Sequence, residues 1–228
     1  MEIKHIEEFE KFVNSEVKLA AKELESLEEG SRPHLQKLVY TNLVDRFDVM
    51  IDKTILDNCL EPLLLDESLS KLDSPVTESQ VLKLLMDGGN VEDVVRARVR
   101  TVLSNGILRQ RHSKKLSKVF ELFRVEKVWN EPKVNDANGK ILLTFKPQRK
   151  TVPASVCGYA DWLYSRRNAI VHGGGTSNML DNDVLQIEKT FKIKVVKTTK
   201  IKLGAINTTS NFYLDVLSLL KKNITKLS

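Results

Sequence analysis

Apolar residues recur at every third or fourth position through most of the chain, which is the spacing of amphipathic helices. The first such row covers residues 3–29. A second runs from Leu35 to Ile55 and predicts a long core helix over about residues 34–60. Shorter rows predict helices over residues 81–86, 90–105, 113–123, 153–171 and 181–191, and a last helix that starts at Asn207 or Thr208. The pattern therefore predicts a mostly α fold, in one domain over residues 1–228.

Local signals mark several of the predicted helix ends. Thr77 and Gln80 have the spacing of a capping box ahead of the helix over residues 81–86. Asn90 is suited to cap the helix that follows. The glycines at positions 173–175 end the helix that begins at Pro153.

Two stretches break the helical pattern. Residues 128–153 are rich in Asn, Pro and Gly, and we expect a short strand over residues 139–145 within them. Over residues 192–203, Lys alternates with Ile and Val, which predicts a small basic β-hairpin near the C-terminus. We expect residues 68–150 to form an insertion that carries basic helices and the turn-rich segment.

The composition excludes several classes of protein. The longest apolar runs are only a few residues, such as residues 63–65, whereas a membrane-spanning helix needs about 20. Residues 1–8 have neither the basic nor the apolar region of a signal peptide. Cys59 and Cys157 are far apart and form no CxxC motif, so we expect neither disulfides nor a zinc site. These features favour a reduced, cytoplasmic protein without membrane contact, metal or cofactor.

Charge is unevenly distributed along the chain. The net charge is +6, but residues 1–30 hold nine Glu and four Lys, so the remainder carries +11. Basic clusters without acids attract polyanions, although a basic cluster can also be a solvated surface. One acid-free run contains Arg96, Arg98, Arg100, Arg109, Arg111, Lys114, Lys115 and Lys118. The second contains Lys189, Lys192, Lys194, Lys197, Lys200 and Lys202.

One arginine lies in an unexpected place on a helical wheel. At 100° per residue, the apolar face of the helix from Pro153 is centred on Val156 and Leu163, and Arg167 falls in its middle. A guanidinium is always charged, and burying it without a partner is costly. We therefore expect Arg167 to pair with a carboxylate, to lie at a wet subunit interface, or to bind an anionic ligand.

The paired alternative has candidate partners on the long predicted helix. Asp45, Asp48 and Asp52 all lie there, and any of them would neutralise Arg167 in a purely structural role. His172 likewise fits a structural role, because an imidazolium at a helix C-terminus is mildly favoured by the helix dipole.

Residues 165–173, which read SRRNAIVHG, resemble the signature of the HEPN superfamily, the higher eukaryotes and prokaryotes nucleotide-binding domain. That signature is an Arg, then four to six residues of which the first is often polar, then a His near the end of a core helix. Here Arg167 matches the Arg, Asn168 the polar residue and His172 the His. The resemblance implies an HEPN-like helical bundle of the bacterial toxin or defence type.

The resemblance also implies a function. Many HEPN proteins are metal-independent RNA endonucleases that form homodimers with two Arg–His motifs in one cleft. An imidazole can accept or donate a proton at the ribose 2′-hydroxyl or the 5′-leaving oxygen. An arginine can hold the scissile phosphate and stabilise developing charge. By this resemblance Arg167 and His172 are catalytic, Asn168 and Arg166 support them, and the products are a 2′,3′-cyclic phosphate and a 5′-hydroxyl.

We expect RNA, a second copy of the chain, and an antitoxin or defence-system protein as partners. Two other functions remain open: a non-catalytic HEPN module that binds nucleotide, RNA or a partner protein, and a helical oligomerisation domain without a nucleic-acid role. Metal-binding, Walker A, Rossmann and nucleophile-elbow motifs do not occur in the sequence. The expected RNA contacts are Arg96, Arg100, Arg109, Arg111, Lys114 and Lys115.

Overall fold

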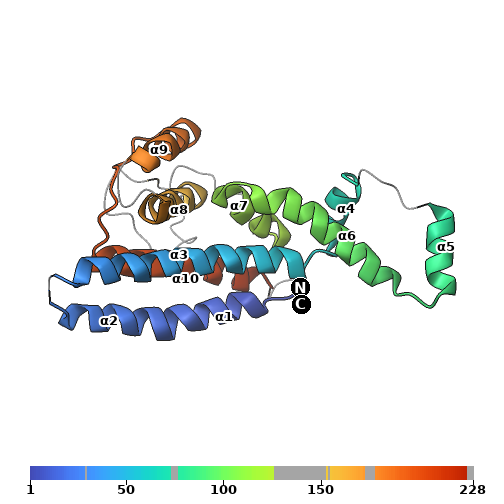
Figure 1. The fold of residues 1–228 in the computed structure, drawn as a ribbon, viewed down its shortest axis with the longest axis horizontal. Helices are drawn as coiled ribbons and strands as arrows, with labels where there is room; N and C mark the ends of the chain where they lie inside the picture. The colour runs from blue at the N-terminus through green and yellow to red at the C-terminus, as the bar shows by residue number, and fades with distance from the viewer. Residues whose placement is uncertain (29, 73–76, 126–152, 154, 173–177, 225–228) are drawn as a thin grey trace.

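A computed structural model describes residues 1–28, 30–72, 77–125, 153, 155–172 and 178–224, and it is mostly helical, as the sequence predicts (Figure 1). One layer contains α1 (Lys4–Phe12) and α2 (Lys18–Ser26), which a π-helical turn (Val13–Val17) joins into one rod. The long helix α3 (Arg32–Asp57) runs back along this rod, and α10 (Leu203–Ile224) packs beside both.

An aromatic cluster holds this layer together. The rings of Phe47 from α3 and Tyr213 from α10 stack with centroids 3.8 Å apart. Phe9 from α1 packs 5.4 Å from Phe47 and 5.8 Å from Tyr213. All three side chains are almost completely buried. Aromatic burial at this three-helix contact therefore fixes the register of α1, α3 and α10.

A second layer covers the other side of α3. It consists of α7 (His112–Leu122), α8 (Val156–His172) and α9 (Asn178–Phe191). Helices α7 and α8 both pack on α3, and α9 packs on α8. Helix α8 is therefore covered on opposite sides, which explains why its residues 156–163 are all buried.

The remaining helices project from one end of the bundle as an arm (Figure 1). The arm contains α4 (Pro62–Leu69), α5 (Glu78–Met86), α6 (Val91–Asn105) and a 3-10 turn (Ile107–Arg109). The capping box of Thr77 and Gln80 is confirmed, and Asn90 caps α6 by accepting a hydrogen bond from the Glu92 amide. Helix α5 lies farthest from the bundle and has no buried residue.

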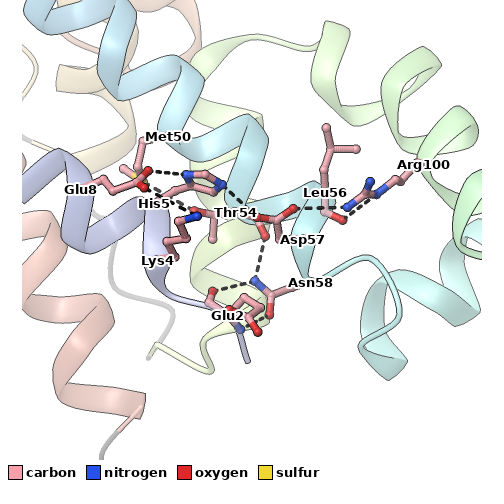
Figure 2. A network of polar contacts seen from close by, with 10 residues as sticks. All are labelled: Glu2, Lys4, His5, Glu8, Met50, Thr54, Leu56, Asp57, Asn58 and Arg100. Carbon is pink, nitrogen blue, oxygen red and sulfur yellow. Dashed lines mark hydrogen bonds and ion pairs between the residues drawn. The ribbon is translucent and has the colours of Figure 1, made fainter.

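A polar network joins the arm to the bundle, as Figure 2 shows. Arg100 of α6 donates hydrogen bonds to the Leu56 carbonyl and to the Asp57 carboxylate, each at 3.3 Å. The other oxygen of Asp57 lies 2.9 Å from Nε2 of His5, whose Nδ1 lies 2.8 Å from Glu8. Asp57 therefore connects α6 to both α3 and α1.

Two details differ from the sequence predictions, and a third cannot be compared. Helix α10 begins at Leu203, earlier than Asn207 or Thr208. The hairpin expected over residues 192–203 does not form: residues 192–202 contain no strand, and residue 203 begins α10. The strand expected over residues 139–145 lies outside the described residues.

The physical reason for the missing hairpin is that other partners satisfy the backbone of this segment. The Val195 amide donates to the carboxylate of Glu188 at 2.8 Å. The carbonyls of Thr198 and Lys200 accept hydrogen bonds from the side chain of Arg166. Val195 and Ile201 point into the core, so the alternation reflects burial of one side against the bundle rather than strand pairing.

Candidate functional site

Arg167 and His172 meet at the C-terminal end of α8. Nη1 of Arg167 lies 3.5 Å from Nε2 of His172, a contact in which the guanidinium is the donor and the imidazole the acceptor. His172 is exposed, whereas the Arg167 side chain is 19 % exposed. The two residues diverge on a helical wheel, but the long arginine side chain reaches across the final turn of the helix. The two ends of the predicted motif are thus brought together.

Arg167 also has the carboxylate partner that its structural alternative required. Its Nε forms an ion pair with Asp45 of α3, whose side chain is 40 % exposed. Asp45 also lines a groove of about 320 Å³ between α1 and α3. The guanidinium is therefore shared between a carboxylate on one side and His172 on the other.

Asn168 and Tyr164 complete the surroundings of Arg167. The Asn168 side-chain oxygen accepts a hydrogen bond from Nη1 of Arg167 at 2.9 Å. The Tyr164 ring lies 6.0 Å from the guanidinium carbon. Asn168 thus contacts the arginine, and these contacts hold the guanidinium beside His172.

Arg166, not Arg167, is the deeply buried arginine of α8. It is 3 % exposed, and its guanidinium lies 4.5 Å from the Trp162 ring and 5.3 Å from the Tyr40 ring. It donates hydrogen bonds to two backbone carbonyls of the segment over residues 192–202. The helical wheel placed Arg167, and not Arg166, in the buried face because it assumed a single apolar face. In the structure α8 packs against α3 on one side and against α9 on another. The Arg166 side chain thus contacts the segment over residues 192–202 and the two aromatic rings, whereas Arg167 contacts Asp45, Asn168 and His172.

The first basic run is largely neutralised within the fold. Arg96 pairs with Glu92, Arg100 with Asp57, and Arg111 with Asp161 and Asp183. Lys115 is buried between Asp48 and Asp52, and Lys118 pairs with Glu67 and Glu121. Of the six expected RNA contacts, Arg109 and Lys114 are exposed and form no ion pair with another described residue. Half of this run, namely Arg100, Arg111, Lys115 and Lys118, therefore joins different elements instead of presenting charge to a ligand.

The second basic run keeps its charges in solvent. Lys197 pairs with Asp181 at 3.1 Å. The other lysines of this run are exposed, and none has an ion pair among the residues that the structure describes: Lys189, Lys192, Lys194, Lys200 and Lys202. This run is the stronger anion-attracting surface of the two.

The sequence analysis missed a buried cluster of charged residues below the motif. His112, which is fully buried, lies 3.0 Å from Asp48, and its ring stacks on Tyr164 at 5.1 Å. Burial acts to raise the pKa of Asp48, but its contacts with His112 and Lys115 outweigh that effect and lower the pKa to about 2. Burial and the nearby Asp48 charge raise the pKa of Asp52. The available signal was the spacing of Asp48 and Asp52 on one face of α3.

The described part of the chain contains no cluster of three or more His, Cys, Asp or Glu side chains arranged to hold a metal ion. Within the same residues, every helix is too short or too polar to cross a membrane. Comparison of the chain with protein-family models, curated proteins and solved structures gives no match. The chemistry of the site is therefore argued from its geometry.

The arrangement combines a permanent cation with a group that transfers protons. The contacts of Arg167 with other described residues use Nε and Nη1, so among these residues Nη2 is the donor left for an anion. A phosphate held there would lie close to the imidazole of His172. This combination suits the cleavage or the binding of a phosphodiester.

Proposed function

We propose that the protein is an RNA endonuclease that uses Arg167 and His172 and needs no metal ion. The observation that carries this proposal is the 3.5 Å approach of the Arg167 guanidinium to the exposed imidazole of His172 at a helix end. In the proposed reaction the ribose 2′-hydroxyl attacks the adjacent phosphorus. The bond from phosphorus to the 5′-oxygen breaks, which leaves a 2′,3′-cyclic phosphate and a 5′-hydroxyl.

Each residue has a defined part in this reaction. His172 accepts the proton of the attacking hydroxyl or delivers a proton to the leaving oxygen. Arg167 holds the phosphate and stabilises the negative charge that develops on it. Asn168 orients the guanidinium through its 2.9 Å hydrogen bond.

The proposal includes a homodimer. The reaction removes one proton and delivers another, and a second copy of His172 allows these two steps to use separate imidazoles. His172 is exposed at the end of α8, so it is accessible to a second copy. Light scattering at micromolar concentration tests whether the protein is a dimer. If a monomer cleaves RNA, the homodimer is not part of the mechanism.

Cleavage of total RNA in the presence of EDTA tests the chemistry. We expect the wild type to cut and to leave cyclic phosphate ends. His172→Ala or Arg167→Ala should slow cutting by about a hundredfold or more. His34→Ala is the matched control, because His34 is exposed on α3 away from the motif, and it should retain full activity. Equal cutting by wild type and His172→Ala would refute the catalytic role of His172.

A non-catalytic HEPN module that binds nucleotide, RNA or a partner protein is the second candidate. The ion pair between Arg167 and Asp45 favours it, because a neutralised arginine has a structural role without any substrate. Strong RNA binding without cleavage of any RNA would support this candidate.

A role in toxin or antiphage biology belongs to the proposal of an RNA endonuclease. Host-cell growth arrest that depends on His172 would support that role.

A further inference from the structure

The segment over residues 192–202, here called the lysine strap, runs without helix or strand from α9 to the start of α10 at one end of the bundle (Figure 1). Its apolar side chains Val195 and Ile201 are buried, and Ile193 is half-buried. Its lysines at positions 192, 194, 197, 200 and 202 are exposed. The strap thus has an apolar inner side and a cationic outer side.

The charge on the outer side is mostly uncompensated. Apart from Lys197 with Asp181, the strap lysines form no ion pair with any described residue. The carboxylate of Glu188 is engaged by the Val195 amide. This situation contrasts with residues 96–118, where acids from α3 and α4 neutralise Arg100, Lys115 and Lys118. Of the two basic runs, the strap is therefore the one available to an anionic partner.

Arg166 attaches the strap to α8. Its Nε donates to the Thr198 carbonyl at 3.0 Å and its Nη2 to the Lys200 carbonyl at 2.9 Å. The guanidinium fork thus grips two alternate peptide groups of an extended chain. The Trp162 ring lies against the guanidinium and limits its movement.

The attachment point is one residue from the candidate catalytic arginine. Arg166 and Arg167 are consecutive, so their Cα atoms are about 3.8 Å apart. Arg166 reaches toward the strap, while Arg167 reaches toward Asp45 and His172. An extended polyanion that lies along the strap would therefore run beside the C-terminal half of α8, which carries Arg167 and His172.

We propose that the lysine strap binds the RNA phosphate backbone and leads it to Arg167 and His172, with Arg166 as the positioning residue. The destination of the RNA rests on the proposed function, whereas RNA binding by the strap does not. Lysines are mobile point charges without a fork, so the strap contacts phosphates with little base specificity. The strap exposes one large apolar residue, Val196, and this favours a soluble polyanion over a lipid surface.

The binding test uses the His172→Ala protein, so that RNA remains intact, and measures the anisotropy of a labelled 30-nucleotide RNA. The test variant carries Lys192→Gln, Lys194→Gln, Lys200→Gln and Lys202→Gln. The control variant carries Lys11→Gln, Lys22→Gln, Lys53→Gln and Lys83→Gln, which removes the same charge from exposed positions elsewhere. We expect the test variant to lose about tenfold or more in affinity at low salt and to show a shallower salt dependence, because each lost phosphate contact lowers the slope. The control should change by less than about threefold.

The positioning role of Arg166 has its own test. Arg166→Lys keeps the charge but loses the fork that grips two carbonyls. We expect the Arg166→Lys variant to keep the circular dichroism spectrum of its parent. Its RNA affinity should stay within about threefold of that of the parent. Its cleavage rate at saturating RNA should fall by about tenfold, because the strap is no longer fixed beside Arg167. Faster amide exchange confined to the strap should accompany this loss.

The outcomes separate this inference from the nuclease proposal. Loss of RNA binding in the strap variant supports the strap even if the wild type cleaves no RNA, in which case the nuclease proposal alone fails. If the strap variant and the control variant have equal affinity for RNA, the lysine strap does not bind RNA and the inference is overturned. A strap that binds phosphatidylserine vesicles but not RNA also overturns the inference. If Arg166→Lys leaves both cleavage and exchange unchanged, Arg166 has no positioning role.

Discussion

Arg167 of α8 forms an ion pair with Asp45 of α3, and the same guanidinium lies 3.5 Å from Nε2 of His172. The carboxylate and the imidazole engage different nitrogens, so both contacts exist together. Asp45 holds Arg167 in place but also places a negative charge next to the expected phosphate position. The pair is thus a structural contact that opposes anion binding.

Replacing Asp45 by Asn should therefore strengthen RNA binding. Asn keeps an oxygen acceptor for Arg167 and removes the repulsive charge. In the His172→Ala background we expect the dissociation constant to fall on the order of fivefold at low salt, with a smaller effect at high salt. Asp66→Asn, an exposed acid on α4, is the control for net charge. An affinity equal to that of the control would show that no phosphate approaches Arg167.

The buried cluster below the motif predicts a pH-dependent contribution to stability. The folded pKa of Asp48, about 2, lies below its ordinary value of 3.8 because His112 and Lys115 outweigh burial. The ionised form is therefore favoured by folding. Asp48 stabilises the fold fully above about pH 5, and this contribution is lost as the pH falls through the ordinary value of 3.8 toward about 2. Asp48→Asn should lower the free energy of unfolding by about 2 kcal/mol at pH 7.

Urea unfolding of wild type and Asp48→Asn, from pH 7 down to pH 2, measures this effect. The difference between the two proteins should be constant above pH 5 and should shrink below pH 4. A difference that stays the same at all pH values would mean that Asp48 acts through packing instead of charge.

Gly158 marks a close approach between α8 and α9. A Cβ atom at this position would lie 2.7 Å from Oγ of Ser155 and 3.0 Å from Phe191. Gly158→Ala should therefore destabilise the protein by about 1–3 kcal/mol, although alanine favours helices. Gly204 of α10 has no atom within 4 Å of such a Cβ, so Gly204→Ala should stabilise by up to about 1 kcal/mol. A lower melting temperature for Gly158→Ala and a higher one for Gly204→Ala would confirm these two predictions. Equal shifts in the two variants would contradict them.

The connection between arm and bundle can be tested with two arginines of α6. Arg100 crosses to α3, whereas Arg96 pairs with Glu92 inside its own helix. Arg100→Gln should raise amide exchange in α6 and leave the α3 centre unchanged, because it removes a contact between elements. Arg96→Gln should have little effect on exchange. Similar exchange in both variants would show that apolar packing alone holds the arm.

The sequence predicted what depends on neighbours along the chain. The apolar row of α3 and the capping box of Thr77 and Gln80 are local features, and both are confirmed. The fate of the first basic run was not predictable, because the acids that pair with Arg100 and Lys115 lie more than 40 positions away in the sequence. Burial of Arg166 was missed for a related reason: a helical wheel shows one apolar face but not the elements that cover the opposite side.

For Arg167 of the motif, the sequence left more than one kind of partner open. The ion pair with Asp45 was one of the stated alternatives for Arg167, whereas the contact with His172 was not among them. Arg167 makes both contacts at once, because a guanidinium offers several donors in different directions. The alternation of residues 192–202 was interpreted as a hairpin, but in the structure it reflects one buried side, because periodicity contains no information on hydrogen-bond partners.

Helix α5 is closed by a capping box at its start and by Gly88, which has a φ of +69°, just after its end. None of its nine residues is buried, and isolated helices of this length are marginal in water. Its unwinding therefore requires no disruption of the aromatic cluster around Phe47. We expect trypsin to cut after Lys83 at an early stage of digestion, while the bundle still gives its native circular dichroism signal. Insertions, deletions or cleavage within α5, at the tip of the arm, should then leave the fold of the bundle intact.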